Sequence, residues 1–331
     1  MVTVAVTGAG GFVGGHVCRA LVERGYRTIG MTRTGSTRQL PADLLERVEM
    51  RQGDVLDMTS LDAALKEADV VVHCAALVTV DDNACANTMA VNATGTGNVL
   101  QTCLNLGISR VVHVSSVHAY ARMRGKVLNG DASLALDATL AYPSSKAAGH
   151  QAVLQAIAQG RIGGCVICPG PIIGPGDDRP SVAGGLVLDF ALRKVPMTIN
   201  EGFWWSDVRD VADAVASAVS CGKDGKVYFT LGRYAKLAQL ARIISRYTGC
   251  GPPRLSVPYW VAVAGLPAVR AYAAARRLSP LYTRAALSLA RNCPASADDG
   301  SARNQLGYTA RPLEESIKDT VAWFRQNGDL A

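Results

Sequence analysis

The chain has 331 residues, a net charge of +7 and an apolar fraction of 49%. This length can bury a substantial core in one or two domains, and the apolar fraction is ordinary for a globular protein. The charge is modest for the length and no basic run is interleaved with aromatic residues, so composition argues against a nucleic-acid partner.

The first predicted strand, residues 2–7, enters a glycine-rich turn with glycines at a spacing of three: Gly8, Gly11 and Gly14. An apolar helical stripe follows the turn. A strand–turn–helix unit of this kind leaves free backbone N–H groups that face the pyrophosphate of a dinucleotide. We therefore predict a dinucleotide site here, with Phe12 and Val13 as further contacts. An ordinary glycine-rich turn is the alternative.

The second predicted strand, residues 27–32, ends at Arg33, and Arg38 follows it. An NAD site usually has an Asp or Glu in this region to bind the ribose hydroxyl, but residues 24–42 contain no carboxylate. Arginine instead suits a 2′-phosphate through charge-assisted hydrogen bonds. The sequence thus favours NADP(H), with NAD(H) as the alternative cofactor. A solvated loop with surface arginines is the other interpretation.

The third and fourth predicted strands, residues 48–53 and 69–74, are followed by candidate cofactor contacts: Asp54, Val55, Ala75, Ala76 and Leu77. Small residues at a strand's carboxyl end leave room for a flat ligand. Asp54 can accept a hydrogen bond from the adenine amino group. An aspartate at a turn or helix start explains it equally well.

A later strand, residues 110–116, ends in Ser115 and Ser116, and the next helix carries Tyr142 and Lys146. These two residues are four apart and share a helical face. An ammonium beside a phenol lowers the phenol's pKa and makes it a usable general acid or base. A serine hydroxyl supplies a second donor to the same substrate oxygen. On its own, a Tyr–Lys pair at this spacing is more often a helix-surface pair.

The motifs together resemble those of the extended short-chain dehydrogenases/reductases. The residues that carry the likeness lie at 7–14, 54–55, 73–76, 91–95, 114–116, 142–146, 169–175 and 207–212. The resemblance implies that Tyr142 is the acid/base, that Lys146 binds the ribose and lowers the phenol's pKa, and that Ser116 binds the substrate oxygen. Ser115 is the alternative for the last role. The resemblance further implies that Asn92 supports the site and that Pro169, Gly170 and Ile172 line the nicotinamide.

Within that family the chain is most similar to the dihydroflavonol-reductase-like and 3β-hydroxysteroid-dehydrogenase-like group, through residues 174–177, 306–308 and Trp323. Family dehydratases carry Asp-Glu after the active-site hydroxyl residue, whereas Ser116 is followed by Val117 and His118. Nucleotide-sugar epimerases that retain NAD usually have an acid where this chain has Arg33. Both differences argue for a dehydrogenase or reductase.

The predicted fold is α/β: a Rossmann doubly wound parallel sheet with a smaller, mainly α substrate-binding domain towards the C-terminus. Residues 1–169, rejoined by about 204–230, form the dinucleotide domain, and residues 170–203 and 231–331 form the cap. The cap is apolar, with Trp204, Trp205, Tyr259 and Trp260 among its aromatics. A lipophilic or aromatic carbonyl or alcohol substrate suits such a pocket.

Nine cysteines at irregular spacing predict free thiols in a reducing cytoplasm. Cys165 and Cys168 lie in an apolar strand, and no histidine cluster completes a site, so no metal is predicted. The first strand begins at Val2, which predicts a cytoplasmic protein without a signal peptide. Residues 257–269 are too few to span a membrane. Peripheral membrane contact by the arginine-bearing segment after them is the alternative to a packed cap helix.

The function predicted from these residues is NADP(H)-dependent reduction of a ketone or aldehyde, or oxidation of the matching alcohol. An NAD(P)-dependent epimerase is the alternative within enzymes, and a non-catalytic NADP-sensing protein is the alternative of another class. The resemblance also implies a homodimer, formed through helices near residues 84–106 and 141–158.

Overall fold

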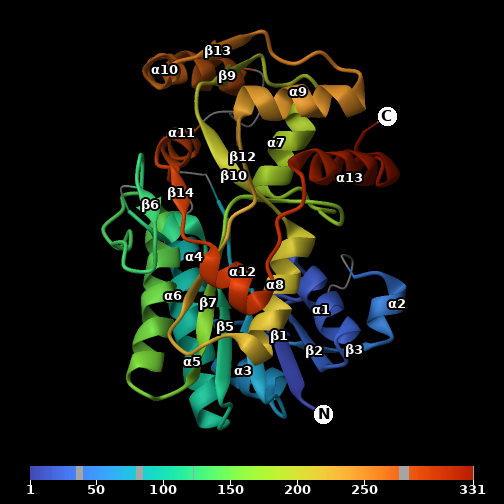
Figure 1. Cartoon of the computed structure of the whole chain (residues 1–331), viewed down its shortest axis with the longest axis vertical. Helices are drawn as coiled ribbons and strands as arrows, with labels where there is room; N and C mark the ends of the chain where they lie inside the picture. Colours follow the sequence, from blue (N-terminus) through green and yellow to red (C-terminus); the bar gives the residue numbers. More distant parts are fainter. Residues whose placement is uncertain (35–39, 80–84, 122, 276–282, 331) are drawn as a thin grey trace.

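The structure, a computed structural model, describes residues 1–34, 40–79, 85–121, 123–275 and 283–330. A parallel sheet of seven strands forms its lower half (Figure 1). The strands lie in the order β11-β7-β5-β4-β1-β2-β3. Their bounds are Thr3–Thr7 for β1, Arg27–Thr32 for β2, Val48–Gln52 for β3, Val70–His73 for β4, Arg110–Val114 for β5, Gly163–Pro169 for β7 and Val227–Thr230 for β11. This doubly wound order confirms the predicted Rossmann α/β fold.

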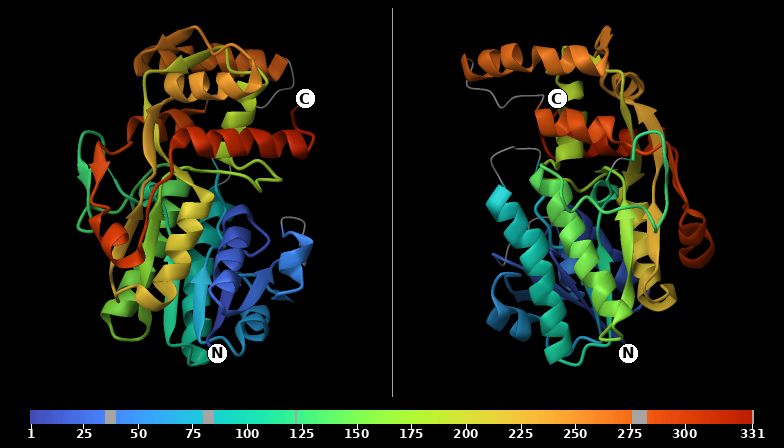
Figure 2. Two further views of the ribbon diagram at one scale, coloured as in Figure 1. Left: turned by 45° about the vertical axis from the view of Figure 1, so that its right-hand side comes forward. Right: turned by 90° about the vertical axis from the view of Figure 1, so that its left-hand side faces the viewer.

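Helices cover both faces of the large sheet, so its central strands are apolar and almost fully buried. One face carries α1 (Phe12–Glu23), α8 (Val208–Cys221) and α12 (Gly300–Leu306). The other carries α3 (Met58–Leu65), α5 (Gly95–Asn105) and α6 (Ala141–Ala158). The long helices α5 and α6 run side by side (Figure 2). The short helix α2 (Ala42–Leu45) packs near β3, and the short helix α4 (Cys85–Met89) packs against α6.

The helix expected over residues 84–106 is interrupted. A π-helical turn, Ala90–Thr94, separates α4 from α5. A π turn contains one more residue per turn than an α-helix, and such turns occur often at functional sites. Here the turn contains Asn92, which is 2% exposed.

The cap sits beyond the carboxyl ends of the strands, and the C-terminus lies within it (Figure 1). A three-stranded sheet, in the order β12-β10-β8, joins it to the nucleotide-binding half. These strands span Arg233–Lys236 for β12, Gly202–Asp207 for β10 and Ile172–Ile173 for β8. Two further pairs are β9 (Met197–Ile199) with β13 (Leu255–Val257), and β6 (Val127–Leu128) with β14 (Ser296–Ala297).

Among the described residues of the cap there are also five helices: α7 (Val182–Ala191), α9 (Leu237–Thr248), α10 (Tyr259–Ala275), α11 (Arg284–Arg291) and α13 (Leu313–Gln326). They enclose a separate apolar core that includes Phe190, Leu240, Ile317 and Phe324. Because segments 170–207 and 231–330 both contribute, the cap is discontinuous in the chain. The exact domain boundaries stay a prediction.

Candidate active site

The glycine turn between β1 and α1 leaves no room for side chains. Gly8 has a φ of 73°, and a Cβ there would lie 2.8 Å from the Ala75 Cα. A Cβ on Gly14 would lie 2.1 Å from the Gly8 carbonyl oxygen. Gly11 starts α1 without any side-chain cap, so the first-turn N–H groups of the helix are open to an anion. The turn therefore fits the pyrophosphate of a dinucleotide, which Phe12 and Val13 in the first turn would face.

The predicted ribose and adenine contacts lie on the loops next to this turn. Arg33 follows β2 directly and is exposed, and its carbonyl accepts a hydrogen bond from Gln52 at 3.3 Å. Arg38 lies outside the described residues. The Asp54 carboxylate accepts the Leu56 N–H at 2.9 Å, which is the turn role that the sequence left open. Val55 is buried, with its side chain against Gly95 of α5.

A chain of buried hydrogen bonds, which the sequence did not reveal, connects this region to the π turn. Thr96 donates its hydroxyl to the Asn92 carbonyl at 2.7 Å, so it can accept only from His73 Nε2, at 3.0 Å. His73 Nδ1 must then accept from the Thr7 hydroxyl, at 2.7 Å. The Thr7 oxygen accepts the Ala75 N–H in turn. Burial lowers the pKa of the His73 ring to about 3, so the ring is neutral, as this assignment of donors and acceptors requires.

Asn92 bridges three elements through its side-chain amide. Its oxygen accepts the Leu77 N–H at 2.7 Å, and its NH₂ group donates to the Leu77 carbonyl and to Ser145 Oγ. Ser145 lies on α6 beside Lys146. Asn92 therefore fixes the loop after β4 relative to the helix that carries Tyr142 and Lys146. Its effect on these two residues is indirect, through Ser145.

Ser115 and Ser116 point to different partners, as neighbouring residues at a strand end do. Ser115 Oγ lies 3.0 Å from His150 Nδ1, within the core. Ser116 Oγ instead accepts the His118 N–H at 3.1 Å, and its hydroxyl lowers the pKa of the Tyr142 phenol. Of the two alternatives, Ser116 is the serine that the structure brings to Tyr142.

Tyr142 and Lys146 lie on α6 and are both almost fully buried. Lys146 Nζ donates to the Val114 carbonyl at 2.8 Å, and burial lowers the pKa of this amine to about 8. The pKa of the Tyr142 phenol is raised by burial, and the hydrogen bond with Ser116 offsets part of this. This corrects the expectation from helical spacing that the phenol's pKa would fall, because spacing does not report how deeply the pair is buried.

The segment expected to line the nicotinamide leads from the large sheet into the cap. Pro169 ends β7, and the Gly170 N–H donates to Ser206 Oγ on β10 at 3.2 Å. A Cβ on Gly170 would lie 2.0 Å from the Trp204 carbonyl oxygen, so only glycine allows this approach. Ile172 pairs with Ser206 in the sheet of the cap. The segment therefore crosses over the carboxyl ends of the strands.

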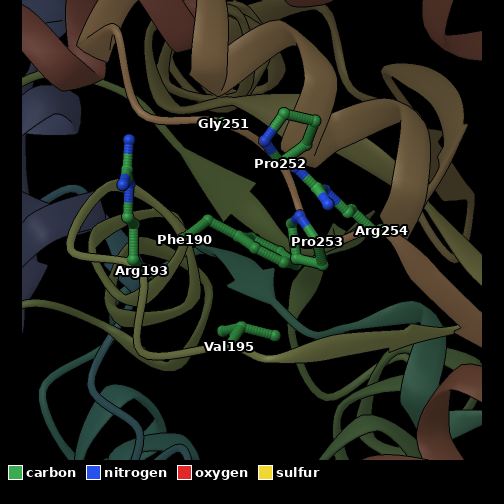
Figure 3. A pocket seen from close by; sticks show the side chains of 7 residues that line it. All are labelled: Phe190, Arg193, Val195, Gly251, Pro252, Pro253 and Arg254. Atoms are coloured by element: carbon green, nitrogen blue, oxygen red, sulfur yellow. The ribbon is translucent and has the colours of Figure 1, made fainter.

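A pocket of about 300 Å³ lies elsewhere in the cap, between the end of α7 and the loop after α9 (Figure 3). Arg193 and Arg254 flank it, with Phe190 and Pro253 beneath. None of the predicted site residues lines it. Across the described ranges, no group of three or more His, Cys, Asp and Glu side chains could hold a metal ion. No helix among the described residues is long and apolar enough to cross a membrane.

The fold and these motifs define an NAD(P)-dependent enzyme of the extended short-chain dehydrogenase/reductase class. The chain belongs to the NAD dependent epimerase/dehydratase family, whose model matches residues 4–230. It is 29% identical to sterol demethylase protein B of Methylococcus capsulatus, over 98% of this chain and 99% of that one. It is 28% identical to mouse (Mus musculus) 3 beta-hydroxysteroid dehydrogenase type 7, over 97% and 95% respectively. The crystal structure of gox2253 is 31% identical, with a TM-score of 0.84 over 100% of this chain and 99% of that one.

Proposed function

We propose that the protein is an NADP(H)-dependent carbonyl reductase, acting on a ketone or aldehyde or oxidising the matching alcohol, with Tyr142 as general acid/base. The observation that carries the proposal is the placement of buried Tyr142 one helical turn before Lys146 on α6, with the buried Ser116 hydroxyl acting on the phenol. Hydroxyl and phenol can donate to one carbonyl oxygen as charge develops on it.

A bound nicotinamide dinucleotide supplies or accepts the hydride. The glycine turn would hold its pyrophosphate, and Lys146, largely protonated at neutral pH with a pKa of about 8, would bind the ribose hydroxyls. The raised pKa of Tyr142 keeps the phenol protonated at neutral pH. In this state the phenol can donate a proton to a substrate oxygen during reduction.

Arg33 supports the choice of NADP(H). It lies directly after β2, is exposed, and has no carboxylate near it in the chain. A guanidinium at this strand end would bind a 2′-phosphate bidentately. NAD(H) has a hydroxyl at this position, so the same arginine would make no charge-assisted contact with it.

A lipophilic substrate is favoured by what the cap offers. Phe203 and Trp205 lie on β10, next to the segment that crosses from β7. The names of two relatives refer to sterol and hydroxysteroid chemistry, which fits an apolar substrate with few charges.

Titration of the protein with NADPH and NADH, followed by tryptophan fluorescence, tests the cofactor. Wild type should bind NADPH more tightly, and Arg33→Ala should remove the preference, since it loses a charge-assisted contact. Arg161→Ala, an exposed arginine beyond the far end of α6, is the matched control and should behave as wild type. Equal or tighter binding of NADH, unaffected by Arg33→Ala, would contradict the NADP(H) proposal.

Tyr142→Phe tests catalysis. Turnover of carbonyl substrates, measured as loss of NADPH absorbance, should fall by about 10²–10⁴-fold while NADPH affinity stays unchanged. Turnover without net NADPH consumption would indicate an epimerase instead. A protein whose NADPH binding is intact but which reduces no carbonyl compound, before or after the substitution, would be a sensor.

A further inference from the structure

His118 occupies the boundary between the catalytic residues and the cap. It lies in a 3₁₀ turn, Val117–Ala119, directly after Ser116. Its ring meets the Tyr142 ring edge-on, with centroids 6.4 Å apart. It also meets the Phe203 ring of β10, with centroids 6.3 Å apart and an angle of 88° between the rings. One aromatic ring from the nucleotide-binding half thus contacts both the phenol and the cap.

The backbone of His118 already has a role in the site. Its N–H donates to Ser116 Oγ at 3.1 Å, so the serine oxygen accepts there and the serine proton can be donated to the Tyr142 phenol or to a substrate oxygen. The 3₁₀ turn thus places the His118 side chain next to Ser116 in the chain, and its ring lies against the Tyr142 ring.

The ring has unused hydrogen-bonding capacity. In the part of the chain that the structure describes, neither ring nitrogen makes a hydrogen bond, and the residue is half-buried rather than sealed. Burial lowers the pKa of the ring to about 4, so it is neutral at pH 7. A neutral imidazole has one N–H donor and one nitrogen acceptor, and both suit an uncharged oxygen on a ligand.

We infer that His118 binds a second oxygen of the substrate, close to the reacting carbon, while Phe203 packs on the substrate's apolar body. The inference rests on the proposed function and deepens it. It narrows the substrate class from any lipophilic carbonyl compound to one with a hydroxyl or carbonyl oxygen next to the reacting carbon. His118 is then a residue that determines specificity, and it takes no part in the proton transfer.

A matched pair of ketones tests this: 3-hydroxy-3-phenylbutan-2-one and 3-phenylbutan-2-one, which differ only in the neighbouring hydroxyl, a tertiary one that the oxidised cofactor cannot oxidise. Their binding is measured by calorimetry with the protein saturated with the oxidised form of its preferred cofactor, so that no turnover is needed. Wild type should bind the hydroxyketone about tenfold more tightly, the effect of one well-formed hydrogen bond.

His118→Phe keeps the ring and its contacts but removes both nitrogens, so it should bind the two ketones equally. His118→Asn keeps a donor and an acceptor and should retain part of the preference. Tyr234→Phe, which removes a hydroxyl beside Trp204 on the other face of β10, is the control. Thermal unfolding of each variant shows whether it is folded.

The inference is overturned if wild type binds neither ketone, if it does not distinguish them, or if His118→Phe keeps the full preference. NADPH consumption with the same ketones tests the proposed function separately. Preference without turnover would contradict the carbonyl-reductase proposal and leave the role of His118 standing. Turnover without a preference between the ketones would support the carbonyl-reductase proposal and contradict the role of His118.

Discussion

The nucleotide-binding half and its junction with the cap are stabilised by different interactions. Around the glycine turn the contacts are uncharged: tight backbone packing and the hydrogen bonds that join Thr7, His73 and Thr96. At the junction they are ionic. Arg209 on α8 binds Asp207, which is 3% exposed, and reaches Asp319 on α13 at 2.7 Å. Arg311 binds Asp210 at 2.7 Å.

The two kinds of interaction suit different tasks: neutral close packing gives a rigid region, and ion pairs give a region that can adjust. Close-packed neutral groups allow one arrangement, which suits a site that must hold a cofactor in a fixed position. Partly exposed ion pairs respond to salt and pH and tolerate small displacements. We therefore expect the cofactor site to be rigid and the cap to vary with solution conditions.

The largest effect should come from filling the glycine turn. Gly14→Ala puts a Cβ 2.1 Å from the Gly8 oxygen, so it should destabilise the protein by about 3 kcal/mol or more and abolish cofactor binding. Gly97→Ala is the control, since this glycine is exposed on α5 with nothing within 4 Å. It should stabilise the protein by about 0.5–1 kcal/mol in urea unfolding. Similar unfolding curves for both variants would contradict the claim that the glycine turn is rigidly packed.

Removing a cation at the junction should cost less. Arg311→Met leaves Asp210, 8% exposed, without its guanidinium, and should lower the free energy of unfolding by about 2 kcal/mol. Arg246→Met breaks an exposed pair with Glu314 and should change it by less than about 0.5 kcal/mol. Both are measured at low and high salt. An Arg311 effect that does not shrink as salt increases would contradict an ionic junction.

Asp177, at the start of the cap, should make part of the stability depend on pH. Burial raises the pKa of its carboxyl from 3.8 to about 6, so the fold favours the protonated acid. Ionisation therefore costs stability, a cost that is absent below about pH 4 and complete above about pH 6. Asp177→Asn should thus gain about 3 kcal/mol relative to wild type between pH 4 and pH 7 in urea unfolding. A difference that stays flat across this range would contradict the prediction.

The smallest effect should come from the neutral network. Thr96→Val keeps the shape but leaves His73 Nε2 without an acceptor, and should cost about 1–2 kcal/mol and weaken cofactor binding. Thr102→Val on the same helix removes only a 3.9 Å contact with the Met58 sulfur and should be nearly neutral. Equal costs for the two variants would show that the network adds no stability of its own.

Local signals made the large sheet predictable. Each apolar run, the glycine spacing and each helical pattern is contained in a short stretch of sequence. The Rossmann fold could therefore be predicted from the sequence. The site was only partly predictable. The sequence placed Tyr142 and Lys146 on one helical face, but it could not choose between Ser115 and Ser116. Strand alternation makes their directions differ without saying which one reaches Tyr142.

Contacts between distant residues were beyond the reach of the sequence. His73 and Thr96 are 23 positions apart, and His118 and Phe203 meet only because the cap folds back over the sheet. No local pattern marks either pair. The direction of the Tyr142 pKa also depends on burial by surrounding elements, which helical spacing does not encode.

The π turn at Ala90–Thr94 adds one residue to an otherwise continuous helix. In a regular helix each residue turns the chain by about 100°, so deleting one residue here would rotate α5 by that angle relative to α4. Asn92 could then no longer meet both Leu77 and Ser145, although every other side chain would still be present. Chain length in this segment is thus as restrictive as residue identity, and natural or engineered deletions should be tolerated less well here than in the surface loops.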